Sequence, residues 1–111
     1  MRNYIDWAKT AQNLKLLRND NLNLRKFCCQ ALYYNKANCA GDCAACKFDM
    51  DACIGLVSQN ELADVFGVSP GVVANWETGR TTPDLEDLIF YSKICGLGLS
   101  DVIVFKEEIK F

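Results

Sequence analysis

Apolar residues recur three and four positions apart along most of the chain, and this spacing predicts α-helices. Alternating apolar and polar runs, which are typical of strands, are few and short. We expect two helices in the first third of the chain, at residues 3–18 and 22–35, separated by Asn-Asp-Asn at 19–21. Asn and Asp side chains accept hydrogen bonds from free backbone N–H groups, so this tripeptide can end one helix and cap the next.

Each of these helices carries an apolar stripe along one face, and we expect the stripe of the second to be buried. In the first helix the stripe comprises Tyr4, Trp7, Ala8, Ala11, Leu14 and Leu17 or Arg18. In the second it comprises Leu24, Phe27, Cys28, Ala31 and Leu32.

Start and stop signals then define two short helices. Ser58 and Glu61 have the spacing of a capping box, and Gly67 ends the helix that they open. Ser69 followed by Pro70 is a second start signal, because proline at the first helical position loses no hydrogen bond. This second helix is expected to occupy residues 70–78 and to stop at the glycine that follows.

The remaining helices are marked in the same way. Thr82-Pro83 repeats the start signal, and Gly96 ends the helix that it opens. Ser100 begins a last short helix, after which residues 104–111 form either its frayed end or a short strand. The expected inward positions of the Pro83 helix are Leu85, Leu88, Ile89, Tyr91 or Ser92, and Cys95.

Length and composition indicate one soluble globular domain, residues 1–111. Half of the residues are apolar, and a chain of 111 residues can build a core of its own. No run approaches the roughly 18 apolar residues of a membrane span. The first residues, MRNYIDWAKTAQNL, lack the apolar region of a signal peptide, so we expect a cytoplasmic protein.

Two short capped helices separated by FGVS suggest a helix-turn-helix unit. Residues 58–103 resemble the helix-turn-helix domain of lambda-repressor/Cro-like, or xenobiotic-response-element, regulators. The resemblance is carried by Ser-Gln at 58–59, ELA at 61–63, GVS at 67–69 and NWETG at 75–79. It implies an all-α five-helix bundle in which residues 22–35 are the first core helix. Residues 1–21 would be an additional N-terminal helix, and 36–55 a Cys-rich insertion between the first two core helices.

The resemblance also implies a sequence-specific DNA-binding transcriptional regulator, with no enzymatic reaction. The helix that follows Ser69 would lie in the major groove, where Asn75 is the side chain able to read a base edge. Gln59 would contact the phosphate backbone and brace the reading helix. The full set of expected DNA-binding residues is Gln59, Asn60, Ser69, Pro70, Gly71, Ala74, Asn75, Thr78, Arg80 and Thr81, with Thr82 as a further candidate for backbone contact.

The charge distribution predicts that a single copy of the chain binds DNA weakly. Residues 1–36 carry seven Lys/Arg against two Asp, whereas residues 37–111 carry five Lys/Arg against twelve Asp/Glu. Because affinity for DNA depends on neutralised phosphates, we expect a homodimer on double-stranded DNA. The face formed by Tyr4, Trp7 and Leu14 is a candidate dimer contact, since the helices after residue 58 do not need it for their own core.

The alternative function is a protein-interaction module, such as an antitoxin-like or anti-regulator partner, that kept the fold without contacting DNA. Trp76 is interpreted as a core residue. Glu77 is expected to bind neighbouring backbone or Arg80.

Seven cysteines in a chain without histidine favour metal ligation by thiolates over a disulfide framework. Four of them fall within residues 38–53, and a loop of this length needs something to order it. We expect a structural Zn²⁺ held by Cys39, Cys43, Cys46 and Cys53. An iron–sulfur cluster or a disulfide switch is an alternative, and Cys28 or Cys29 could replace Cys39 as a ligand. Cys95 is interpreted as a small apolar core residue.

Overall fold

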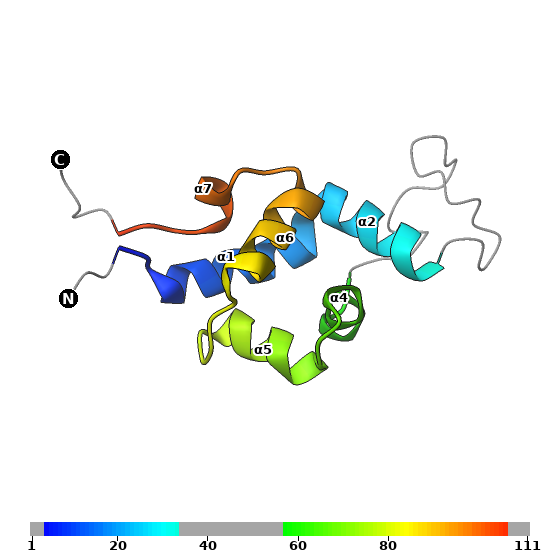
Figure 1. Cartoon of the computed structure of the whole chain (residues 1–111), viewed down its shortest axis with the longest axis horizontal. Helices are drawn as coiled ribbons and strands as arrows, with labels where there is room; N and C mark the ends of the chain where they lie inside the picture. Colours follow the sequence, from blue (N-terminus) through cyan, green and yellow to red (C-terminus); the bar gives the residue numbers. More distant parts are fainter. Residues whose placement is uncertain (1–3, 34–56, 107–111) are drawn as a thin grey trace.

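The computed structural model describes residues 4–33 and 57–106, and these form the helical architecture that the sequence predicts (Figure 1). Its helices are α1 (Trp7–Asp20), α2 (Leu22–Tyr33), α4 (Gln59–Phe66), α5 (Pro70–Thr78), α6 (Leu85–Cys95) and α7 (Leu99–Val102). In the described part, extended pairing is confined to one antiparallel bridge, between Ile5 and Phe105. No helix in these ranges is long and apolar enough to cross a membrane.

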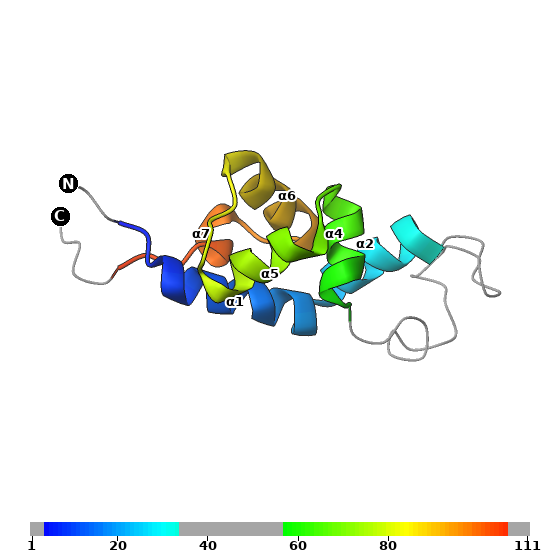
Figure 2. The ribbon, with the colours of Figure 1, turned by 90° about the horizontal axis from the view of Figure 1, so that it is seen from below.

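Asn21 forms the junction between α1 and α2. Its backbone N–H donates to Leu17 O at 2.9 Å, which closes α1, while its side-chain Oδ1 accepts from Leu24 N at 2.8 Å, which caps α2. Its Nδ2 also donates to Cys95 O at the end of α6, at 3.3 Å. The predicted break is therefore confirmed at Asn21, although α1 continues through Asp20, two residues beyond the predicted end. α1 and α2 follow one another along the length of the molecule (Figures 1 and 2).

The first helix begins four residues later than predicted, because Asp6 caps it by accepting from Lys9 N at 3.0 Å. The residues before it are extended and pair with the segment after α7. Asp6 N donates to Val104 O at 2.8 Å, and Lys106 N donates to Tyr4 O at 2.9 Å. Residues 104–111 were expected to be either a frayed helix end or a short strand. Residues 104–106 are extended and pair with the start of the chain, in agreement with the second alternative.

The helix-turn-helix boundaries agree with the sequence. Ser58 Oγ accepts from Glu61 N at 3.0 Å, and the Glu61 carboxylate accepts from Ser58 N at 2.9 Å, which completes the capping box. Gly67 and Gly79 end α4 and α5 in the left-handed conformation, with φ of 74° and 78°. Ser69 differs from the prediction, because its side chain forms no capping hydrogen bond and α5 starts on the proline alone.

The start predicted for the next helix at Thr82-Pro83 is wrong by two residues. The N-cap of α6 is Asp84, whose carboxylate accepts from Asp87 N at 2.9 Å. The Asp87 carboxylate in turn accepts from Asp84 N at 3.3 Å. Two aspartates thus form a capping box where the sequence analysis recognised only Thr-Pro. The last helix also differs slightly, since α7 begins at Leu99 after Gly98 rather than at Ser100.

One hydrophobic core unites the described helices. Phe66 of α4 is partly buried and packs against it, with ring centroids 5.4 Å from Trp76, 4.8 Å from Phe90 and 4.7 Å from Tyr91. The core interpretation of Trp76 is therefore confirmed. Several predicted inward positions are instead exposed, since the neighbouring helices cover other faces: Phe27, Ala31, Leu85 and Ile89.

α1 belongs to this core. Its Leu14 is 0% exposed and clusters with Trp76 and Val73 of α5, so it is not available for the dimer contact expected of the Tyr4, Trp7 and Leu14 face. α1 packs along α5, whereas α2 packs against α4 and α6 (Figure 2). Residues 7–20 are therefore no appendage to a bundle that starts at residue 22. α1, rather than α2, is the helix that supports α5.

Two glycines provide a matched test of the left-handed turn that ends α4. A Cβ at Gly67 or at Gly71 would meet nothing within 4 Å, but only Gly67 has a positive φ. We expect Gly67→Ala to lower the free energy of unfolding by about 1 kcal/mol, because alanine is strained in that conformation. Gly71→Ala, inside α5, should raise it by up to about 1 kcal/mol. Urea unfolding measures both, and equal effects from the two variants would contradict the assignment.

Candidate nucleic-acid interface

α4 and α5 form a compact helix-turn-helix, in which a three-residue turn from Gly67 to Ser69 joins two helices that pack against each other. The left-handed Gly67 lets the chain reverse, and Pro70 starts the second helix without losing a backbone hydrogen bond. α5 lies on the outside of the molecule, between α4 and the turn that leads to α6 (Figures 1 and 2). Its inner side is fixed by the core, and its outer side is free to meet a ligand.

A buried ion pair fixes the inner side of α5. Arg18 of α1 donates from Nε to Glu77 Oε2 at 2.7 Å and from Nη2 to Glu77 Oε1 at 2.9 Å. The Glu77 side chain is only 1% exposed and that of Arg18 11%. Such a bidentate contact is geometrically specific, so it defines how α5 lies on α1. The expectation that Glu77 binds backbone or Arg80 is wrong, because the carboxylate faces inward.

The same pair connects to the start of α4. Gln59 donates from Nε2 to Glu77 Oε1 at 3.0 Å, and Arg18 donates from Nη1 to Val57 O at 2.7 Å. Both Glu77 oxygens therefore have partners, and three segments of the chain converge on one carboxylate–guanidinium pair. The expected bracing of α5 by Gln59 is present as this hydrogen bond. The amide is turned inward in this arrangement, and its contact with phosphate stays a prediction.

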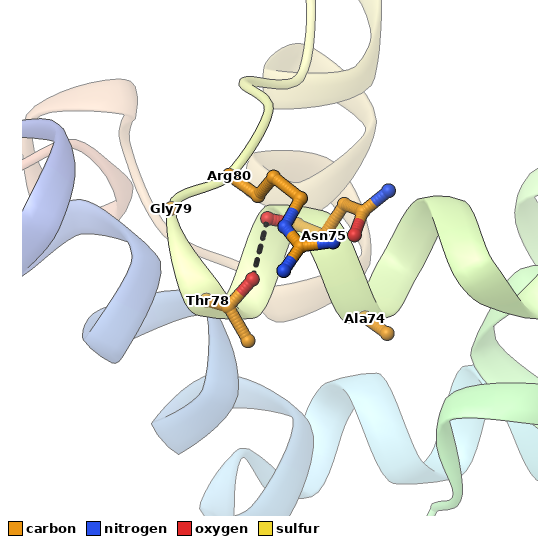
Figure 3. Close-up of a pocket in the computed structure, with 5 residues that line it drawn as sticks. All are labelled: Ala74, Asn75, Thr78, Gly79 and Arg80. Atoms are coloured by element: carbon orange, nitrogen blue, oxygen red, sulfur yellow. Dashed lines mark hydrogen bonds between the residues drawn. The ribbon is translucent and has the colours of Figure 1, made fainter.

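The outer side of α5 gathers four of the ten predicted DNA-binding residues around its C-terminal end. A shallow surface hollow of about 510 Å³ is lined by Ala74, Asn75, Thr78, Gly79 and Arg80 (Figure 3). All but Gly79 had been predicted. Of the other predicted residues, Asn60, Ser69, Pro70, Gly71 and Thr81 are exposed.

The backbone at the end of α5 is held by its own hydrogen bonds. The carbonyl oxygen of Asn75 accepts from Arg80 N at 3.0 Å, from Thr81 N at 3.3 Å and from Thr78 Oγ1 at 3.2 Å. The Asn75 amide forms no hydrogen bond within residues 4–33 and 57–106, and the Arg80 side chain reaches back over α5 toward it (Figure 3). The hollow therefore presents one amide and one guanidinium on a fixed backbone.

The predicted zinc ligands Cys39, Cys43, Cys46 and Cys53 lie outside the described residues. Within the described part, no cluster of His, Cys, Asp and Glu side chains could hold a metal ion. Cys28, Cys29 and Cys95 are all buried there. Burial raises the pKa of Cys28 and of Cys95 to about 12, so both are neutral thiols packed in the core at physiological pH. This confirms the interpretation of Cys95.

Arg18 is the residue that the sequence analysis underestimated. It was placed on the apolar stripe of the first helix as an alternative to Leu17, although an arginine on such a stripe needs a buried partner. Glu77, next to the core residue Trp76, was the acidic residue able to supply one. Arg18 and Glu77 are 59 residues apart in the sequence, so no local pattern indicated that they would meet.

The ion pair yields a stability prediction. Arg18→Met keeps the side-chain stem but leaves a buried carboxylate unpaired, so we expect the free energy of unfolding to fall by about 3 kcal/mol. Adding Glu77→Leu should recover much of this loss, because the double variant removes both charges. Lys15→Met, at an exposed position of α1, is the control and should change stability by less than about 0.5 kcal/mol. Thermal and urea unfolding would refute the role of the pair if Arg18→Met behaved like the control.

Comparison with known proteins gives a match for the segment that contains α4 and α5. No curated protein and no solved structure matches the chain. The family model described as Helix-turn-helix matches residues 56–102, from just before the capping box of α4 to the end of α7. This stretch is thus similar to the lambda-repressor/Cro-like helix-turn-helix domain, a similarity that indicates DNA binding and transcriptional regulation.

Proposed function

We propose that this protein is a sequence-specific DNA-binding transcriptional regulator that places α5 in the major groove of its operator. The observation that carries the proposal is the surface around α5. Its outer side exposes small and polar residues, and the Arg18–Glu77 pair holds its inner side on the core. That surface lies within the segment that matches the helix-turn-helix family model.

Electrostatics within the site support this proposal. An exposed carboxylate at the end of α5 would repel phosphates, but Glu77 is buried and already neutralised by Arg18. α5 contains no other acidic residue, and Arg80 follows it on the exposed turn. The reading surface is therefore neutral to weakly basic, although the chain as a whole carries a net charge of −2.

So little positive charge implies that one copy binds weakly, since each phosphate contact contributes to affinity. We therefore propose a homodimer on a two-fold symmetric operator, which doubles the contacts. Phosphate contacts are assigned to Arg80, Thr81, Asn60 and Ser69, all of which are exposed at the ends of α4 and α5.

A second candidate function, a protein-interaction module on the same fold, is favoured by the exposed apolar residues of α6. Leu85 is 64% exposed and Ile89 39%, four residues apart on one helix. The acidic residues at the start of α6 would disfavour nucleic acid at that surface. A protein that bound no duplex DNA at low ionic strength would support this candidate over the regulator.

The zinc site stays part of the proposal. Cys39, Cys43, Cys46 and Cys53 would hold a structural Zn²⁺ in the segment between α2 and α4, with an iron–sulfur cluster as the alternative. Because Arg18 binds the carbonyl of Val57, the C-terminal end of this segment is attached to the same ion pair that holds α5.

Arg80 allows a direct test of DNA binding. If Arg80 contacts a phosphate, Arg80→Ala should weaken binding to all duplexes alike and should reduce the slope of log K against log salt by about 1 per subunit. Lys93→Ala removes an exposed positive charge from α6 and is the control, whose slope should not change. Fluorescence anisotropy between low and physiological salt measures both. Equal slopes for the two variants would remove Arg80 from the interface.

Metal content is tested by elemental analysis of protein purified under reducing conditions. We expect one zinc per chain, lost in Cys43→Ser because a tetrahedral site then lacks one thiolate. Cys95→Ala, which removes a buried thiol of the core, should keep its zinc. If the protein contains iron and absorbs visible light, the iron–sulfur cluster becomes the supported hypothesis in place of zinc. Protein that contains neither metal would rule out both hypotheses.

A further inference from the structure

We infer that the surface of α5 reads an A·T-rich half-site, in which Asn75 recognises adenine while Ala74 and Thr78 contact thymine methyl groups. This inference rests on the proposed function and deepens it, because it names the base pairs that the site takes.

First, the outer surface of α5 lacks the side chains that most often read guanine or cytosine. Guanine is read in the major groove chiefly by Arg or Lys, and cytosine by a carboxylate that accepts from its amino group. α5, with the sequence PGVVANWET, contains no Arg or Lys. Its one acidic residue, Glu77, is buried, and both of its oxygens are occupied by Arg18 and Gln59. α5 therefore carries neither the cation nor the free carboxylate that most often selects a G·C pair.

The second step is the chemistry of Asn75. An amide offers one acceptor and two donor hydrogens side by side, and these match N6 and N7 of adenine. The Asn75 side chain is half-buried and forms no hydrogen bond within residues 4–33 and 57–106. Its backbone carbonyl oxygen accepts from Arg80 N, Thr81 N and Thr78 Oγ1 among others, so the side-chain amide is attached to a fixed backbone.

The third step concerns the neighbours of Asn75 on the outer side of α5. Thr78 donates its hydroxyl to the Asn75 carbonyl at 3.2 Å, which turns its methyl group away from the helix (Figure 3). Ala74 lies four residues earlier on the same side and also presents a methyl group to the hollow (Figure 3). In the major groove only thymine offers a methyl group, and Ala and Thr methyls are suited to contact it.

Gly71 extends the same side of α5 toward its N-terminus. It has no Cβ, and the space that a Cβ would fill is open. The helix backbone can therefore approach the floor of the groove closely at this end. Ala74 and Thr78 have short side chains, which can reach the base edges only if the helix backbone lies close to them.

Among the described residues that line the hollow, Arg80 is the one cation, and it lies beyond Gly79, outside α5. We assign it to a phosphate, because it follows the last residue of the helix proposed to read the bases, although its side chain reaches back toward Asn75 (Figure 3). An Arg80 that read guanine would instead produce a G·C pair in the preferred sites.

The test begins with selection of binding sites from randomised duplexes at low ionic strength, with the full chain. The inference predicts half-sites in which about three or four adjacent positions are A·T. Sites enriched in G·C at those positions, or a guanine whose preference disappears in Arg80→Ala, would overturn it. Failure to bind any duplex would instead overturn the proposed function itself, so the two failures are distinguishable.

On a selected site, two changes should have separate effects. Asn75→Ala should lower discrimination at one adenine by about tenfold, whereas Gln12→Ala, which removes an exposed amide from α1, should leave it unchanged. Replacing the contacted thymines by deoxyuridine should weaken binding about fourfold for each methyl lost. The same replacement outside the half-sites is the control. Binding that tolerates deoxyuridine at every position would refute the methyl contacts, and melting curves verify that both variants fold.

Discussion

The buried ion pair between Arg18 and Glu77 is the interaction on which the arrangement of this protein depends. It joins the end of α1 to the end of α5, and through Val57 and Gln59 it also attaches the start of α4. Two charges removed from water are tolerated only when each finds a partner of good geometry, and the bidentate contact supplies one. Because a bidentate contact is geometrically specific, a change in the way α5 lies on α1 would weaken it.

This constraint matters for the proposed function, because a helix that is already held in one position loses less conformational freedom when it binds DNA. The inner side of α5 is fixed by Trp76 in the core and by Glu77 on Arg18, while its outer side keeps the amide of Asn75 available. Burying the only carboxylate of α5 also removes the charge that would most directly repel phosphates. One contact thus serves packing and electrostatics together, and it leaves a neutral surface that presents methyl groups and one amide.

Sequence reasoning succeeded where the signal was local. The capping box of Ser58 and Glu61, the proline start of α5 and the terminal glycines each involve residues within one helical turn, so their spacing alone determined the boundaries. It failed where two local signals competed, as at α6, where the Asp84–Asp87 box took precedence over Thr82-Pro83. It also failed for inward faces such as Leu85 and Ile89, because helical period identifies a stripe but not which neighbour covers it.

The sequence by itself determined the helices, their caps, the helix-turn-helix unit and most of the residues that surround the hollow on α5. Only the tertiary structure decided that α1 is the helix supporting α5, that Glu77 faces Arg18 rather than Arg80, and that Leu14 belongs to the core instead of a dimer surface. The physical reason is distance along the chain. Caps and turns are bonds between near neighbours, whereas the pairing of charges 59 positions apart follows from how whole helices pack.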